Sequence, residues 1–186
     1  MSVKIGVYVC HCGTNISGKV NVTEVKDFAQ TLPCVEIARE YKFMCSDPGQ
    51  DLIKQSIRDC DLNRIVVASC SPLMHEPTFR GAGEQADLNR HLFQMANIRE
   101  HCSWVTVDPS AATEKAKMLV AGAVAERGLP VSSDIAPNRS PAPSSAGGRA
   151  SPSRRCSRPS AWPATPGSTS STTPSSCSSP APPTTW

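Results

Sequence analysis

The sequence lacks any run of about 20 apolar residues, the length that a transmembrane helix needs. Its first ten residues, MSVKIGVYVC, lead into a strand-like segment and lack the long apolar core and cleavage site of a signal peptide. Residues 1–130 also lack an excess of positive charge, since 14 basic and 15 acidic side chains give a net charge of −1. We therefore expect a cytoplasmic protein that binds neither a membrane nor nucleic acid.

The last part of the chain differs in composition from the rest. Residues 131–186 contain 16 serines and 11 prolines, but no lysine and one acidic residue, Asp134. Such a segment buries too little apolar surface to offset the entropy of the chain. We expect an α/β domain over residues 1–107, a linker helix over 108–128 and a disordered Ser/Pro-rich tail over 129–186.

Short β-branched segments alternate with helix-like segments along residues 4–128. This alternation favours a small Rossmann-like three-layer α/β domain with a parallel sheet of about four strands, followed by a long C-terminal helix. The third helix is the weakest, because Gly81 and Gly83 each cost about 1 kcal/mol relative to alanine. The strands are expected at 4–10, 35–43, 64–69 and 92–97, and the helices are expected to begin at Asn21, Asp47, Pro77 and Asp108.

Five cysteines lie where the predicted strands end, namely Cys10, Cys12, Cys45, Cys70 and Cys102. The carboxyl ends of parallel strands meet at one edge of a sheet, where such sheets bind their ligands, so we expect the five thiols to gather there. Cys34 precedes a strand and Cys60 closes a helix, which places them apart. In a reducing cytosol, cysteines at this density indicate metal binding or redox chemistry and not structural disulfides.

An iron–sulfur cluster needs four converging thiolates with N–H groups directed at the sulfurs, and loops at strand ends supply such donors. Helix N-termini after Cys45 and Cys70 add partial positive charge. The spacing matches neither common ferredoxin pattern, and Cys10 and Cys12 are too close for a redox C-x-x-C motif. Two alternatives therefore stay open: a non-catalytic docking module with buried cysteines, and a thiol–disulfide redox protein using Cys10 or Cys12 with Cys45.

With five candidate thiols, one is spare. Cys10 shares a face with Tyr8 if the first strand alternates, which favours inward packing, whereas Cys12 lies in the following loop. The preferred ligands are Cys12, Cys45, Cys70 and Cys102, with Cys10 as the alternative. His75 and His101 flank the same edge and are assigned to the second layer around the metal, and no catalytic residue is assigned.

Five motifs carry a resemblance to a known family; they are VCHCGTN (9–15), YKFMCSDPGQ (41–50), VASCSP (67–72), HEPTF (75–79) and ANIREHCSW (96–104). Over about residues 3–130 the chain resembles the N-terminal domain of the A subunit of heterodisulfide reductase, which is the flavin and iron–sulfur subunit. The resemblance implies an oxidoreductase complex of an anaerobic prokaryote and one [4Fe–4S] cluster in the region of the five cysteines. It also implies partnership with other heterodisulfide reductase subunits and with redox proteins.

In the family, an FAD-binding domain and ferredoxin modules follow this domain, and electron bifurcation takes place at the FAD. The present chain has instead the segment APSSAGG at 142–148. One permitted coding of that segment, read in another frame, gives Ala-Leu-Val-Gly-Gly-Gly, which resembles the start of a flavin domain. We interpret the chain as frameshifted or truncated after about residue 130, so that it is not expected to bind FAD or to catalyse alone.

Sequencing the gene and its downstream region tests this interpretation. We expect a reading frame for an FAD-binding domain to resume, in a different phase, shortly after the codons for residue 130. An intact upstream frame with no such domain encoded in any downstream frame contradicts it.

Overall fold

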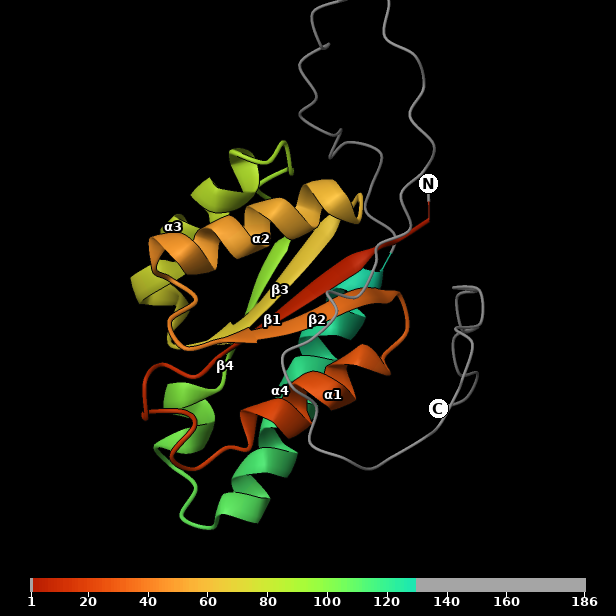
Figure 1. The fold of residues 1–186 in the computed structure, drawn as a ribbon. Helices are drawn as coiled ribbons and strands as arrows, with labels where there is room; N and C mark the ends of the chain where they lie inside the picture. Colours follow the sequence, from red (N-terminus) through yellow and green to blue (C-terminus); the bar gives the residue numbers. More distant parts are fainter. Residues whose placement is uncertain (1, 130–186) are drawn as a thin grey trace, which may run out of the picture.

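The computed structural model describes residues 2–129. Four parallel strands form one sheet in the order β2-β1-β3-β4 (Figure 1). The predicted α/β fold with a four-stranded parallel sheet is therefore confirmed, while the predicted tail lies, apart from Leu129, outside the described residues. The strands are β1 (Ile5–Cys10), β2 (Val35–Tyr41), β3 (Arg64–Ser69) and β4 (Phe93–Asn97).

Helices cover both faces of the sheet and give it three layers (Figure 1). On one face lie α1 (Val22–Gln30) and α4 (Pro109–Gly128), and on the other lie α2 (Asp47–Asp59) and α3 (Pro72–Glu84). The central strands β1 and β3 are buried along their whole length, as parallel strands covered on both faces require. Alternate side chains therefore feed two separate cores.

The two cores contain different cysteines of the predicted site. The first, between the sheet and helices α1 and α4, contains Val7, Val9, Val66, Val120 and Cys102 among its buried residues. The second, between the sheet and helices α2 and α3, is built on aliphatic and aromatic side chains and also contains Cys10. Its members include Tyr8, Ile53, Ile57, Val67, Phe79 and Phe93.

Helix α4 packs against the sheet and belongs to the first core. Its buried side chains include Ala112, Ala116, Val120 and Val124. At its far end, the Arg64 guanidinium donates to the main-chain oxygens of Arg127 and Leu129. The segment predicted as a linker helix thus contributes to the same core as the strands, and the division of the chain into domains stays a prediction.

Two capping predictions are confirmed. Asn21 Oδ1 accepts the N–H of Glu24 at 3.2 Å, and Asp108 Oδ2 accepts the N–H of Ala111 at 2.7 Å. Each side chain satisfies a donor that its helix leaves unpaired. At α2 the residue before the helix is Ser46, so the predicted cap, Asp47, is instead the first helical residue.

Two boundaries and one additional element are the main differences from the predictions. Helix α3 begins at Pro72 and contains Pro77, which the sequence indicates as its start because proline favours the first turn of a helix. Strand β2 ends at Tyr41, two residues early, so that the chain turns before Cys45. A π-helical turn, η1 (Arg99–Ser103), follows β4; such turns are rare, and the sequence pattern does not indicate it.

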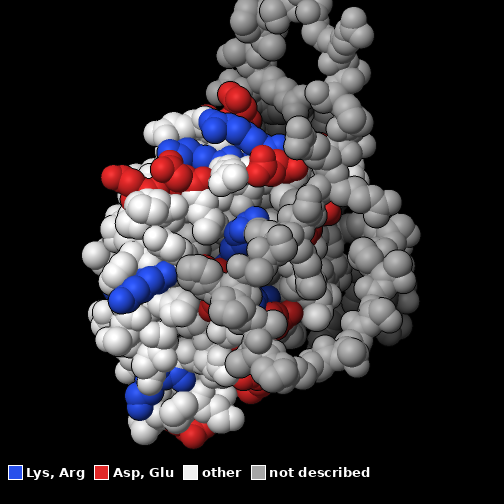
Figure 2. Space-filling model, viewed as in Figure 1, with Lys and Arg blue, Asp and Glu red and all other residues white. Residues whose placement is uncertain are grey.

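No helix among residues 2–129 is long and apolar enough to cross a membrane. Acidic and basic side chains lie side by side on the face seen in Figure 2. On α2, Lys54 and Asp51 form an ion pair. The charges on that face are therefore mixed, as the near-zero net charge of residues 1–130 suggests.

The N-terminus of α2 packs tightly against the turn that carries Cys45. A Cβ atom on Gly49 would lie 2.4 Å from the main-chain oxygen of Met44, so α2 approaches this turn only because the position has no side chain. We expect Gly49→Ala to lower the free energy of unfolding by about 1–3 kcal/mol, measured by urea denaturation of the full chain.

Gly81→Ala is the matched control. A Cβ on Gly81 meets nothing within 4 Å, so alanine there should stabilise α3 by up to about 1 kcal/mol through helix propensity. Equal effects of the two substitutions would contradict the packing described for Gly49.

Candidate functional site

The carboxyl ends of the four strands lie at one level. The register pairs Cys10 with Tyr41 across β1 and β2, and Ser69 with Asn97 across β3 and β4. Strands β1 and β3 are neighbours, and the chain continues from them to β2 on one side and to β4 on the other. This arrangement is the topological switch point at which open α/β sheets bind ligands.

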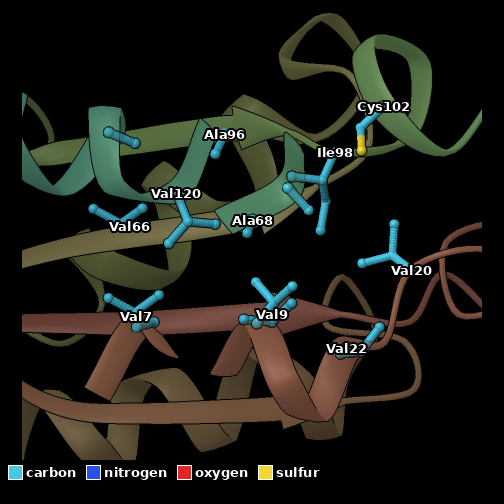
Figure 3. Close-up of a cluster of buried hydrophobic side chains, with 14 of the residues drawn as sticks. Val7, Val9, Val20, Val22, Val66, Ala68, Ala96, Ile98, Cys102 and Val120 are labelled. Carbon is cyan, nitrogen blue, oxygen red and sulfur yellow. The ribbon is translucent and has the colours of Figure 1, made fainter. Parts of the chain in front are cut away.

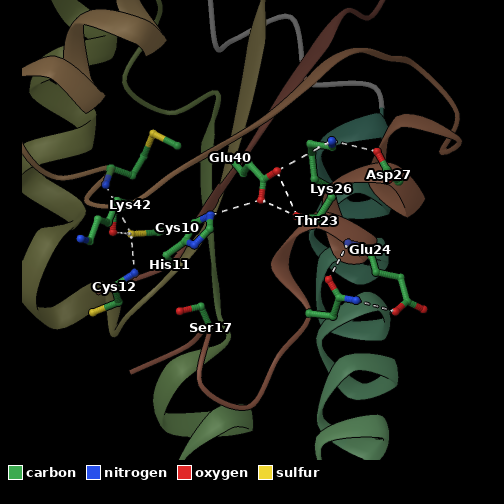
Figure 4. A network of polar contacts seen from close by, with 12 residues as sticks. Cys10, His11, Cys12, Ser17, Thr23, Glu24, Lys26, Asp27, Glu40 and Lys42 are labelled. Carbon is green, nitrogen blue, oxygen red and sulfur yellow. Dashed lines mark hydrogen bonds and ion pairs between the residues drawn. The ribbon is translucent and has the colours of Figure 1, made fainter. Parts of the chain in front are cut away.

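The sulfur of Cys10 lies at this switch point and accepts two main-chain hydrogen bonds. The N–H groups of Cys12 and Met44 each lie 3.3 Å from Cys10 Sγ. The bond from Cys12 is drawn in Figure 4. Cys10 is 4% exposed and shares the second core with Tyr8, as the alternation of the strand predicts. Two N–H donors directed at one sulfur form the kind of environment that stabilises a thiolate ligand.

The loop after β1 adopts left-handed backbone at two successive residues. Cys12 has φ 50° and Gly13 has φ 63°, an uncommon conformation for a residue with a side chain. Gly13 N–H donates to the Lys42 main-chain oxygen at 3.2 Å, and His11 N–H donates to that of Tyr41 at 3.0 Å. These bonds fasten the loop to the end of β2.

A half-buried carboxylate supports the same loop from the other side (Figure 4). Glu40 Oε2 lies 3.2 Å from His11 Nε2, and Thr23 Oγ1 donates to the same carboxylate at 3.2 Å. Lys26 Nζ lies 3.9 Å from Glu40 Oε1. The loop that carries Cys12 is thus connected to both β2 and α1.

Cys45 and Cys70 each lie two residues before the first residue of a helix. Cys45 precedes α2, and Gln50 Nε2 donates to the Cys45 main-chain oxygen at 2.9 Å. Cys70 precedes α3, where Ser71 Oγ accepts the N–H of Leu73 at 3.3 Å. The helix N-termini predicted after both cysteines are therefore present, and each places partial positive charge near a thiol.

Burial and the neighbouring thiols shift the pKa of Cys10. Burial raises the pKa of Cys10 to about 11, although the N–H groups of Met44 and Cys12 act in the opposite direction. The nearby Cys12 and Cys45 thiols raise the pKa of Cys10 further.

Cys70 belongs to the same group. Burial raises the pKa of Cys70, the Arg99 guanidinium lowers it, and the nearby Cys12 and Cys45 thiols raise it. Cys10 ends β1, Cys12 N–H donates to Cys10 Sγ, and Cys45 and Cys70 follow the ends of β2 and β3, the strands on either side of β1. These four residues lie at the edge where the sequence predicts them, and we call them the thiol group.

Cys102 points away from this edge. Its side chain is 0% exposed and lies in the first core, between the sheet and α4 (Figure 3). The thiol donates to the main-chain oxygen of Ala112 at 3.0 Å. Burial raises the pKa of Cys102, and the charged group that opposes this increase is Lys115. The structure therefore brings four of the five predicted thiols together and directs the fifth into the opposite core.

Arg99 is the residue at this edge that sequence reasoning missed. Its Nη1 donates to Cys12 Sγ at 3.3 Å, across 87 positions of sequence. The order Arg99-Glu100 directly after a predicted strand is the signal that could have drawn attention to it. Trp104 is 58% exposed, and its ring centroid lies 4.7 Å from the Arg99 guanidinium carbon.

The two histidines assigned to the second layer lie near the edge on different elements. His75 is half-buried on α3, with its ring 6.4 Å from that of Phe79 in an edge-on arrangement. His101 is exposed on η1. Their role around a metal stays a prediction.

Cys34 and Cys60 lie near the amino ends of β2 and β3, apart from the thiol group. Both are disulfide-bonded, so the expectation that the cytosolic cysteines form no structural disulfides is wrong for these two. Cys10, Cys12, Cys45, Cys70 and Cys102 are free thiols.

Among the described residues, no three Cys, His, Asp or Glu side chains are arranged so that they could hold a single metal ion. A cubane cluster is larger than one ion, so the sulfurs that bind it stand further apart than those around a zinc ion. Four thiols around a switch point, with N–H donors to one sulfur and a guanidinium on another, have the chemistry for such a group.

No protein-family model matches the chain. Over 127 residues, 68% of this chain, it is 62% identical to an iron–sulfur A subunit of the CoB–CoM heterodisulfide reductase of Methanopyrus kandleri. Over the same length it is 60% identical to the A subunit of the H(2):CoB–CoM heterodisulfide,ferredoxin reductase of Methanothermobacter marburgensis. It is 52% identical over 125 residues to the iron–sulfur A subunit of the CoB–CoM heterodisulfide reductase of Methanocaldococcus jannaschii. The matched residues span 19% of the length of each of these relatives.

The exposure of the thiols predicts the order in which they react in the metal-free chain. We expect iodoacetamide to label the half-buried Cys12 and Cys45 first, Cys10 and Cys70 more slowly, and Cys102 last. Peptide mass spectrometry over a time course measures the order, and the chain in urea, where all five should react at similar rates, is the control. Labelling of Cys102 as fast as Cys12 would contradict its position in the first core.

Proposed function

Because the matched two thirds of this chain belongs to the family of heterodisulfide reductase A subunits, we propose that it binds one [4Fe–4S] cluster and relays single electrons within an oxidoreductase complex. The observation that carries this proposal is the thiol group at the β1–β3 switch point, with two N–H groups on Cys10 Sγ. When bound, such a cluster supplies a one-electron carrier.

The residues around the thiol group fit a cluster by their charge. Four thiolates bring negative charge into a largely buried edge, and buried charge is stable only where other groups compensate it. The N–H groups of Cys12 and Met44, the N-termini of α2 and α3 and the guanidinium of Arg99 are donors of that kind.

For the ligands we propose Cys10, Cys12, Cys45 and Cys70. The sequence favours a set in which Cys102 takes the place of Cys10, and keeps Cys10 as the alternative. The hydrogen bonds to Cys10 Sγ and the burial of Cys102 Sγ against Ala112 support the alternative.

The relatives are named as subunits of heterodisulfide reductases, whereas this chain spans about a fifth of their length. We assign to the chain the relay step alone and leave flavin chemistry to the remainder of the full-length subunits. We place the complex in the cytoplasm, where a reducing environment keeps ligands such as Cys10 and Cys12 as thiols. The disulfide-bonded Cys34 and Cys60 lie apart from that group.

Exposed apolar side chains surround the same edge and support contact with other subunits. Phe43, Leu73, Met74 and Trp104 follow the ends of β2, β3 and β4, and Leu73 is 96% exposed. Exposed apolar side chains gathered at one place are typical of protein contact sites. We propose that other subunits of the complex and redox partners approach the thiol group across these four residues.

Iron and acid-labile sulfide in the anaerobically purified full chain test the proposal. We expect about four irons and four sulfides per chain, with a visible absorbance that dithionite bleaches. Substitution of Cys10, Cys12, Cys45 or Cys70 by alanine should lower the iron content, because each removes a proposed ligand.

Cys102→Ala is the matched control, and it should keep about four irons per chain. Loss of iron in Cys102→Ala with iron retained in Cys10→Ala would support the other ligand set. A folded wild-type chain that stays colourless after reconstitution would contradict the proposed relay and favour a docking module with buried cysteines.

A further inference from the structure

The Arg99 guanidinium bridges two sulfur atoms at the edge of the sheet. Its Nη1 donates to Cys12 Sγ at 3.3 Å, and its Nη2 lies 3.3 Å from Met74 Sδ. Cys12 follows β1, Met74 lies in the first turn of α3 and Arg99 begins η1. One side chain therefore connects the ends of three elements at the point where the thiols gather.

The guanidinium is held from its other side by Glu100. Arg99 Nε and Nη2 donate to Glu100 Oε1 at 3.1 and 2.7 Å, and the ring centroid of Trp104 lies 4.7 Å from the guanidinium carbon. The side chain of Arg99 is 12% exposed, so solvent screens its charge little. A guanidinium is not deprotonated in proteins, so Arg99 stays positively charged.

The main chain beneath Arg99 is also fixed. Asn97 Oδ1, at the end of β4, accepts the N–H groups of Arg99 and Glu100 at 3.3 and 3.0 Å. The π-helical turn is closed by the hydrogen bond from Trp104 N–H to the Arg99 main-chain oxygen at 2.9 Å. The position of the guanidinium is thus set by the strand and the turn as well as by its side-chain contacts.

We propose that Arg99 is a positioning residue, which orients the Cys12 sulfur and, by its fixed positive charge, favours the reduced state of the cluster site. This inference rests on the proposed function. One electron taken from an external reductant adds one unit of negative charge at the thiol group. A cation 3.3 Å from one ligand sulfur stabilises that added charge, and hydrogen bonds to ligand sulfurs and local charge are among the factors that set the potentials of such clusters.

Glu100 opposes this effect only in part. Its Oε1 contacts Nε and Nη2, whereas Nη1 faces Cys12, so the cation lies between the carboxylate and the sulfur. The geometry therefore leaves the positive end of the ion pair directed at the thiol group.

Arg99→Gln in the full chain tests the proposal by redox titration with dithionite, followed by visible absorbance and electron paramagnetic resonance. We expect about four irons per chain to be kept and the reduction equilibrium to fall at least tenfold, which is about 59 mV for one electron. The reduction potential of Arg99→Lys should lie between those of wild type and Arg99→Gln, because lysine keeps the positive charge but lacks the planar guanidinium that donates two parallel hydrogen bonds.

Arg80→Gln is the matched control. Arg80 also pairs with a glutamate, Glu76, and lies 5.8 Å from an aromatic ring, that of Phe93, but its other hydrogen bond goes to the main-chain oxygen of Arg90. The Arg80→Gln substitution should leave the reduction potential unchanged. The melting temperatures of the Arg80→Gln and Arg99→Gln chains show whether any change in potential arises from general destabilisation.

The outcomes separate this inference from the proposed function. A folded Arg99→Gln chain that loses iron while Arg80→Gln keeps it supports positioning of Cys12. An iron-loaded Arg99→Gln chain with the potential of Arg80→Gln overturns the inference alone. If Arg99→Gln does not fold, the neutral variant Arg99→Met takes its place, and an iron-loaded Arg99→Met chain with the wild-type potential overturns the inference. A folded wild-type chain that takes up no iron overturns the proposed function, and the inference with it.

Discussion

The parallel register of β1 and β3 is the constraint on which the site depends. These two strands are buried on both faces, so a slip of one residue would exchange the side chains of the two cores. Because Val9 pairs with Ala68, strands β1 and β3 end at the same level of the sheet. The residues that follow Val9 and Ala68 therefore lie next to each other at the switch point. The proximity of Cys10 and Cys70 follows from core packing and does not depend on any bond between the cysteines.

Most of the groups that can compensate charge at the thiol group belong to the main chain. The N–H groups of Cys12 and Met44 are directed at Cys10 Sγ because a left-handed loop and a tight turn leave them there. The N-termini of α2 and α3 face the same edge because each helix follows a strand that ends there. Main-chain donors of this kind are already in place before a ligand binds, so little reorganisation accompanies charge at the sulfurs.

Arg99 contributes a formal charge where the main chain contributes only partial charges. Arg99 follows the edge strand β4, and its side chain reaches past the end of β3 to Cys12, which follows β1. Its partner Glu100 lies in the same π-helical turn and its partner Trp104 caps that turn, so one short segment carries both the cation and the groups that hold it. Exposed apolar side chains next to this turn make the edge suitable for contact with another protein surface.

Local pattern in the sequence determined the order of strands and helices, the caps at Asn21 and Asp108, and the positions of the cysteines after the strands. These features depend on neighbours within a few residues, which is why the motifs and the family resemblance could be read without coordinates. The start of α3 was misplaced because Pro77, which locally indicates the first turn of a helix, is accommodated inside one.

Only the tertiary structure decided which thiols meet. Cys102 follows a strand end like the others, but a π-helical turn is wider than an α-helical one, and Arg99 and Cys102 consequently face different surroundings. Arg99 faces the thiol group and Cys102 enters the core beneath α4. The direction of a side chain in such a turn depends on packing against elements distant in sequence, and no periodicity along the chain records it.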